Sequence, residues 1–170
     1  MTPDQATSTK AAAPGLGDGI RIAKTNEKIA AEFYANAART AGDPMVKKLF
    51  DQLTEFENIH FERLEALEKS LQQSGTFISY AGTDFTLPAG LVIKMPELPE
   101  PSSVMKVITE ASDFEARSEN GYNVLAEMAS DPQGHDMFLK LAEEEHKHYR
   151  TLREVYWTLN NLGEWQGPTR

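Results

Sequence analysis

The sequence contains no cysteine among its 170 residues. Disulfide bonds, thiolate zinc sites, iron–sulfur clusters and thiol nucleophiles are therefore excluded, so any bound metal must be held by oxygen and imidazole nitrogen. Long apolar runs are also missing, and none approaches the roughly 20 residues of a membrane-spanning helix. Residues 1–16 lack the charged start and apolar middle of a secretory signal. We expect a flexible tail over 1–16, a cytoplasmic location and no membrane partner.

Positive charge is scarce, with 17 Lys and Arg against 26 Asp and Glu and a formal net charge of -9. Nucleic acids and anionic membrane surfaces would be repelled, so neither is expected as a partner. Acidity of this kind usually serves solubility. The alternative is that some carboxylates face inward, where a cation would neutralise them.

Four segments have helical periodicity, over about 16–41, 44–73, 102–129 and 132–160. Asp43-Pro44 and Asp131-Pro132 each supply a helix N-cap followed by a proline suited to the first helical position. Ser102 or Ser103 is a candidate cap for the third helix. The segment 75–101 contains several prolines and cannot be one helix, so we interpret it as a long crossover connection between two antiparallel helical hairpins. The bundle is predicted over 17–162, followed by a C-terminal tail over 163–170.

The two predicted hairpins repeat each other without a gap when the sequence is shifted by 88 positions. A shared helix–turn–helix fold explains the matching apolar residues and Asp-Pro pairs, but it does not explain matching Glu, Tyr and His. The matching polar and aromatic pairs are Glu27 with Glu115, Tyr34 with Tyr122, Glu57 with Glu145, and His60 with His148.

These repeated acidic and imidazole groups lie within apolar helical stripes. Glu57 and His60 are three residues apart on one helix face, between Leu53 and Leu64, and the pair Glu145 and His148 repeats this spacing. Four buried glutamates are very unfavourable unless positive charge joins them. Two divalent cations would cancel their total charge of -4. Oxygen and imidazole ligands suit iron or manganese, and zinc can substitute.

Another Glu-x-x-His sequence, Glu143 to His146, competes for the role of ligand pair in the last helix. It falls outside the 88-residue repeat and out of phase with Leu141 and Leu152. We assign this pair to solvent or to contacts behind the ligands, and His135 to the surface.

The aromatic residues allow two interpretations. Tyr34 and Tyr122 are either ordinary bundle aromatics or hydrogen-bond donors that orient the metal-binding carboxylates. Tyr156, Trp157 and Trp165 are expected to pack the last helix or an oligomer contact. Gly121 costs about 1 kcal/mol relative to alanine inside a helix, which indicates either close helix packing or a path to the metals.

With these residues placed, the chain resembles the rubrerythrin-type branch of the ferritin-like superfamily. The matching segments are 27–34, 53–60, 115–122 and 141–148. The resemblance implies an all-α, ferritin-like antiparallel four-helix bundle around a non-haem di-iron centre. Glu57 and Glu145 would bridge the irons, and Glu27 and Glu115 would be terminal ligands. His60 and His148 would each bind one iron.

The sequence also departs from that family. Complete rubrerythrins carry a four-cysteine rubredoxin-type domain, so electrons must here come from an external donor protein. A further family glutamate is replaced by Ser118, with Glu119 out of phase, which puts efficient peroxidase activity in doubt. We expect an oxidoreductase acting on peroxide or oxygen, by peroxidase or ferroxidase chemistry, and a homo-oligomer, a dimer by resemblance. The alternatives are iron handling and a metal-stabilised bundle without turnover.

Overall fold

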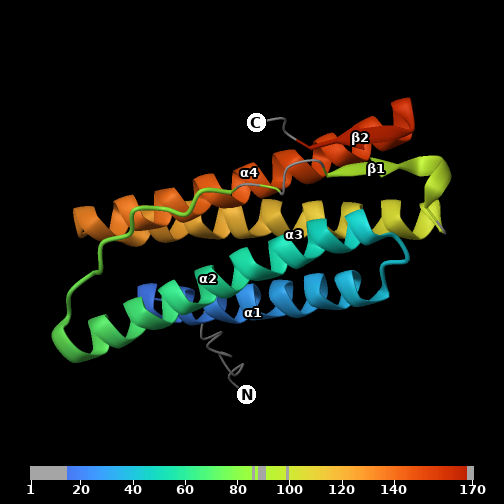
Figure 1. The fold of residues 1–170 in the computed structure, drawn as a ribbon. Coiled ribbons are helices and arrows are strands. Elements are labelled where there is room, and N and C mark those ends of the chain that lie inside the picture. The colour runs from blue at the N-terminus through green and yellow to red at the C-terminus, as the bar shows by residue number, and fades with distance from the viewer. Residues whose placement is uncertain (1–14, 86, 88–90, 99, 168–170) are drawn as a thin grey trace, which may run out of the picture.

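The computed structural model describes residues 15–85, 87, 91–98 and 100–167. Within them the chain forms four long helices, namely α1 (Leu16–Thr40), α2 (Pro44–Ser74), α3 (Pro101–Met128) and α4 (Pro132–Leu162). Figure 1 shows α1 and α2 as one antiparallel hairpin and α3 and α4 as another, packed into a single bundle. The predicted all-α four-helix architecture is confirmed. None of the described helices has the length and apolar character needed to cross a bilayer.

Both predicted Asp-Pro helix starts are present. The Asp43 carboxylate accepts hydrogen bonds from the backbone N–H groups of Met45 and Val46, at 2.8 and 2.9 Å. Asp131 does the same at the start of α4. The expected serine cap of α3 is wrong, because α3 begins at Pro101 and Glu100 precedes it without a side-chain cap. Proline has no N–H that would need a capping partner there.

The crossover connection returns the chain to the other end of the bundle, running beside α4 before it reaches β1 (Figure 1). It contains strand β1 (Val92–Lys94) and the short 3-10 helix η1 (Met95–Glu97). β1 pairs in antiparallel fashion with β2 (Glu164–Gln166), which places Ile93 opposite Trp165. Part of the expected C-terminal tail over 163–170 therefore forms a strand, and residues 168–170 lie outside the described residues. Of the expected N-terminal tail, residues 1–14 lie outside the described part, and Leu16 already begins α1.

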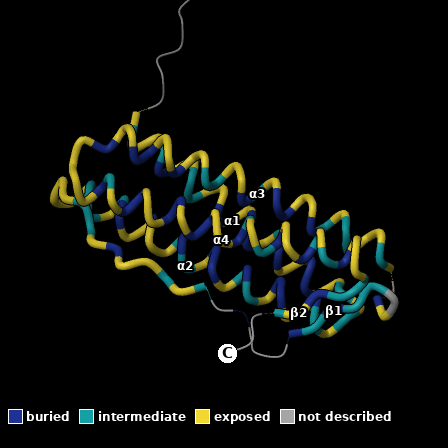
Figure 2. Tube along the Cα trace, turned by 90° about the horizontal axis from the view of Figure 1, so that it is seen from above, coloured by how far each residue is buried: buried dark blue, intermediate teal, exposed yellow. Residues whose placement is uncertain are grey.

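The apolar core has two parts, one toward each end of the bundle. In Figure 2 the buried side of each helix faces its neighbours. One cluster is centred on residues such as Leu53 and Leu152, and the other includes Leu64 and Leu141. Along every helix the buried polar residues fall between the two clusters. The sequence thus builds a polar layer across the middle of an otherwise apolar interior.

We predict that the small sheet fastens the C-terminus to the bundle through Trp165, whose side chain is only 2% exposed. Trp165→Ala should lower the free energy of unfolding by about 3–5 kcal/mol, because it removes a large buried side chain. Trp157→Ala is the matched control, since Trp157 is 59% exposed, and it should change stability by no more than about 0.5 kcal/mol. Urea denaturation measures the free energy of unfolding of both variants, and equal losses of stability would contradict the role assigned to Trp165.

Candidate metal centre

All six predicted ligands meet in the polar layer, and every helix contributes. α1 supplies Glu27 and α3 supplies Glu115, while α2 and α4 each supply one glutamate and one histidine three residues later. Each of the six is at most 2% exposed. The helical period explains this, because all six occupy inward-facing positions of otherwise apolar stripes.

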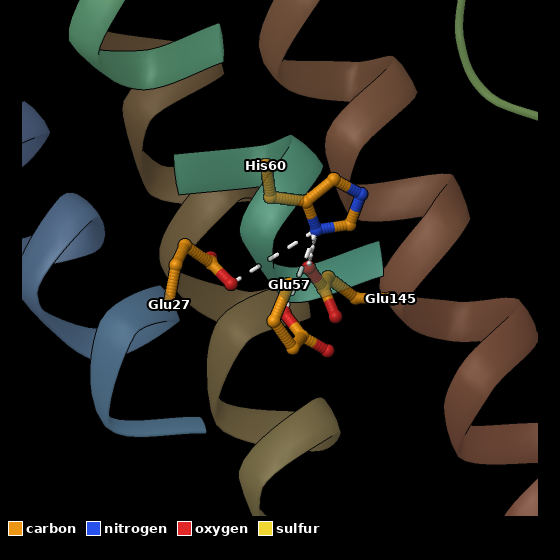
Figure 3. A group of neighbouring side chains, drawn as sticks. All are labelled: Glu27, Glu57, His60 and Glu145. Atoms are coloured by element: carbon orange, nitrogen blue, oxygen red, sulfur yellow. Dashed lines mark ion pairs between the residues drawn. The ribbon is translucent and has the colours of Figure 1, made fainter. Parts of the chain in front are cut away.

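The six side chains form two overlapping groups whose potential ligand atoms lie within 4.8 Å of one another. One group is Glu27, Glu57, His60 and Glu145, drawn in Figure 3. The other is Glu57, Glu115, Glu145 and His148. Glu57 and Glu145 belong to both groups, so these two carboxylates could be shared between two ions. The bridging and terminal roles that the family resemblance implied for these residues stay a prediction.

The potential ligand atoms of the six side chains lie close together around each histidine Nδ1. His60 Nδ1 lies 2.7 Å from Glu145 Oε1, 3.7 Å from Glu57 Oε2 and 3.9 Å from Glu27 Oε2. His148 Nδ1 lies 3.5–3.6 Å from oxygens of Glu57, Glu115 and Glu145. Despite these distances, no hydrogen bond is formed by Nδ1 of either histidine, by either oxygen of Glu57 or Glu145, or by Glu27 Oε2.

Buried polar atoms without partners are costly, at roughly 1–3 kcal/mol each. Here they are concentrated in one place and point inward, and their types are carboxylate oxygen and imidazole nitrogen. Such a set fits two divalent cations, with iron or manganese matching the donors and zinc able to replace them. The residues therefore pass the chemical test for a dinuclear metal site, and iron remains the expected metal.

The electrostatics of the cluster favour positive charge. Burial alone lowers the pKa of His60, but the neighbouring carboxylates, Glu145 first and then Glu144 and Glu57, outweigh it and raise the pKa well above its usual value. The pKa of His148 is raised in the same way. Burial, reinforced by the Glu145 and Glu57 charges, raises the pKa of Glu27. The site draws in protons or cations because four carboxylates share a dry interior.

The two tyrosines hydrogen-bond to carboxylates, but in a crossed arrangement. The Tyr34 hydroxyl of α1 donates to Glu115 Oε1 of α3, and the Tyr122 hydroxyl of α3 donates to Glu27 Oε1 of α1. Each tyrosine thus reaches the glutamate of the opposite hairpin. Burial and the neighbouring carboxylate raise the pKa of both hydroxyls, so they act as donors.

Glu144 is a buried member of this region that the sequence analysis did not assign. Its Oε2 lies 2.9 Å from His60 Nε2 and accepts a hydrogen bond from the Tyr80 hydroxyl at 2.5 Å. Burial raises the pKa of Tyr80 to about 12, with help from this bond. The 88-residue repeat could have indicated that Glu144 is buried, because it aligns Glu144 with Phe56, an apolar residue on the inner side of its helix.

The competing Glu143–His146 pair lies on the surface. Glu143 is 67% exposed and pairs with Lys147 at 3.1 Å, and His146 Nδ1 lies 3.1 Å from Glu119. Neither residue belongs to the metal-ligand groups found among the described residues. His135, expected at the surface, is half-buried near the start of α4.

A groove between α1 and α3 leads toward the cluster. It has a volume of about 220 Å³, and its lining includes Gly121, Ser118, Arg117, Glu27 and Tyr122. A Cβ added to Gly121 would meet no atom within 4 Å. Close helix packing, one of the two explanations that the sequence allowed for this glycine, is therefore wrong. The open groove is consistent with the other interpretation, a path toward the metals.

We predict that Glu57→Ala and Glu145→Ala lose most of the bound metal, because each removes a carboxylate that both ligand groups share. Glu143→Ala should retain it, since that side chain is exposed on the other side of the helix. Elemental analysis of each purified variant, after loading with Fe(II) without oxygen, measures the effect. Normal iron in Glu145→Ala would show that the assigned register of α4 is incorrect.

Comparison with known proteins agrees with this geometry. The family model for rubrerythrin matches residues 4–68, and no curated protein is detectably similar. A hypothetical protein from Pyrococcus furiosus has a similar structure, with a TM-score of 0.69, 26% identity, and coverage of 90% of this chain and 95% of that one. A second similar structure is a two-domain protein from Anabaena variabilis with DJ-1/ThiJ/PfpI-like and ferritin-like domains. It matches with a TM-score of 0.61 and 19% identity, over 99% of this chain and 47% of that one. At this identity the match shows the fold alone. The family match over residues 4–68 and the fold are consistent with a rubrerythrin-type, ferritin-like domain, which is what the chain is similar to.

Proposed function

We propose that this protein is a non-haem di-iron oxidoreductase that reduces hydrogen peroxide or oxygen with electrons from an external donor. The main support is the doubled ligand cluster, in which two carboxylates belong to both groups. Six side chains cannot saturate two iron ions, so coordination positions remain for a small oxidant. A site built only to stabilise the fold would be closed by its own ligands.

The iron pair would supply the electrons that an oxidant accepts, and a bound ion would polarise that oxidant. The chain's own residues would hold the ions, orient the carboxylates and exclude bulk water. Glu57 and Glu145 hold the two positions close together, while Tyr34 and Tyr122 fix the orientation of the terminal glutamates across the hairpins. The apolar clusters on both sides of the layer keep bulk water away from it.

The groove at Gly121 supports a route for a small oxidant. Glu27 and Tyr122 lie at its inner side, and Arg117 and Ser118 contribute polar atoms to the lining. A neutral molecule such as hydrogen peroxide can pass such a lining, whereas the Arg117 guanidinium disfavours the approach of a metal cation. The groove thus favours delivery of oxidant over delivery of iron.

The electron source must be another protein or a small reductant, because the chain has no cysteine to hold a cluster or a rubredoxin-type iron. A homodimer remains an expectation from the family resemblance. Iron handling is the alternative function, since the same cluster could oxidise Fe(II) and pass the product on.

A turnover experiment tests the proposal. Protein loaded with Fe(II) under anaerobic conditions is mixed with excess hydrogen peroxide and an artificial reductant, and peroxide loss is followed together with the absorption spectrum. We expect many equivalents consumed per chain, and no turnover in Glu57→Ala. Accumulation of far more than two irons per chain would instead indicate iron handling. Loss of stability on chelation, with no reaction toward either oxidant, would indicate a structural site.

We further predict that Gly121→Leu slows peroxide consumption several-fold without reducing iron content, because the side chain fills the groove from a position with free space. Leucine also favours the helix over glycine, so stability should not fall. Ser103→Leu is the matched control, since it lies on the same helix in a separate groove that does not include the ligands. An unchanged rate in Gly121→Leu would rule out this groove as the entry route.

A further inference from the structure

The two halves of the repeat differ at one buried position next to the ligands. Shifting Phe56 by 88 residues gives Glu144, so an aromatic ring in one hairpin corresponds to a carboxylate in the other. Both side chains are buried, with 4% and 3% exposure. A buried carboxylate needs polar partners, and a simple repeat provides none at that position.

Those partners come from the crossover connection, which has no counterpart in the repeat. Tyr80 donates its hydroxyl to Glu144 Oε2, and the backbone N–H of Thr83 donates to Glu144 Oε1. Gly82 has a φ of +88° and lies close to the same carboxylate. This backbone conformation favours glycine and places the following N–H toward Glu144. The carboxylate is therefore held from two sides and is directed at His60 Nε2.

The environments of the two histidines consequently differ. His60 Nε2 lies 2.9 Å from Glu144 Oε2. His148 Nε2 is buried without any hydrogen-bond partner. Its ring instead packs against aromatic rings, with centroid distances of 5.3 Å to Phe56 and 4.6 Å to Phe85. His60 Nε2 thus has a carboxylate acceptor, whereas His148 Nε2 has none.

We propose that Glu144 is a positioning residue that makes the two metal positions unequal, so that the ion held by Glu27 and His60 binds first and more tightly than the ion held by Glu115 and His148. The inference rests on the dinuclear site of the proposed function and not on its redox activity.

The chemistry of imidazole explains the difference. A metal binds the nitrogen that carries no proton, so His60 must keep its proton on Nε2 to offer Nδ1 to the cluster. Glu144 accepts that proton in a hydrogen bond, fixes the tautomer and the ring orientation, and makes Nδ1 a stronger donor. His148 must instead leave an N–H unsatisfied in an apolar pocket whenever it binds an ion through Nδ1, which weakens its position.

A titration with Zn²⁺ tests the proposal, because zinc binds these donors without redox chemistry. We expect calorimetry on the whole chain to resolve a tight and a weak binding step. Glu144→Ala should weaken the tight step by about 10–100-fold, the usual effect of losing a partner behind a metal ligand. The weak step should be unchanged. Tyr80→Phe removes one bond to Glu144 and should weaken the tight step by less, with little effect on folding.

The control is Glu143→Ala, which removes the neighbouring exposed carboxylate and should leave both steps unchanged. Nitrogen-15 NMR of the histidine rings adds a readout that a general loss of packing would not mimic. His60 should hold its proton on Nε2 in the natural protein and lose that preference in Glu144→Ala. Two zinc-binding steps of equal affinity in the natural protein would overturn this inference but not the proposed function. Equal weakening of both steps in Glu144→Ala would do the same. Absence of any zinc binding would overturn the dinuclear site and the proposed function with it.

Discussion

The structure depends on how four buried carboxylates are neutralised at the centre of a helical bundle. Their charge must be met inside the protein, because the layer is screened from water by apolar clusters on both sides. Histidines and tyrosines supply part of the compensation through hydrogen bonds and raised pKa values. The four glutamates carry -4 in total, which two divalent ions would cancel while both histidines stay neutral. The cluster therefore couples folding to metal binding, since each ligand atom that finds an ion no longer lacks a partner.

The crossed tyrosines connect this electrostatic constraint to the architecture. A duplicated hairpin could pack against its copy in several registers, because helix faces rich in Leu and Ala are tolerant of sliding. Tyr34 and Tyr122 each donate to the glutamate of the other hairpin, so only one register satisfies both hydroxyls. Polar groups at the centre of the interface thereby specify the alignment that apolar packing leaves open.

The convergence of the six buried Glu and His side chains was predictable from the sequence because each obeys two independent patterns, the helical period and the 88-residue repeat. The Asp-Pro helix starts were predictable because capping is local chemistry. Tyr80, Thr83 and Phe85 were not, because the crossover has no periodicity that indicates which residues return to the bundle. Strand β2 was missed for a similar reason, since its partner β1 lies about 70 residues earlier and pairing over that separation leaves no local pattern. The partners of the tyrosines likewise depend on contacts between hairpins.

The crossover also makes the two halves of the cluster unequal, whereas the repeat alone would make them symmetrical. Glu27, on the lining of the groove at Gly121, belongs to the same ligand group as His60, which Glu144 supports. The group beside the groove is thus the one whose histidine has a carboxylate partner at Nε2. In the other group, the His148 ring packs against Phe56 and Phe85. An oxidant entering by the groove would first meet the position whose ligands are held most firmly. Two hairpins with the same Glu and His residues therefore produce unequal surroundings, because polar groups of a non-repeated segment hold Glu144 beside His60, whereas His148 packs against Phe56 and Phe85.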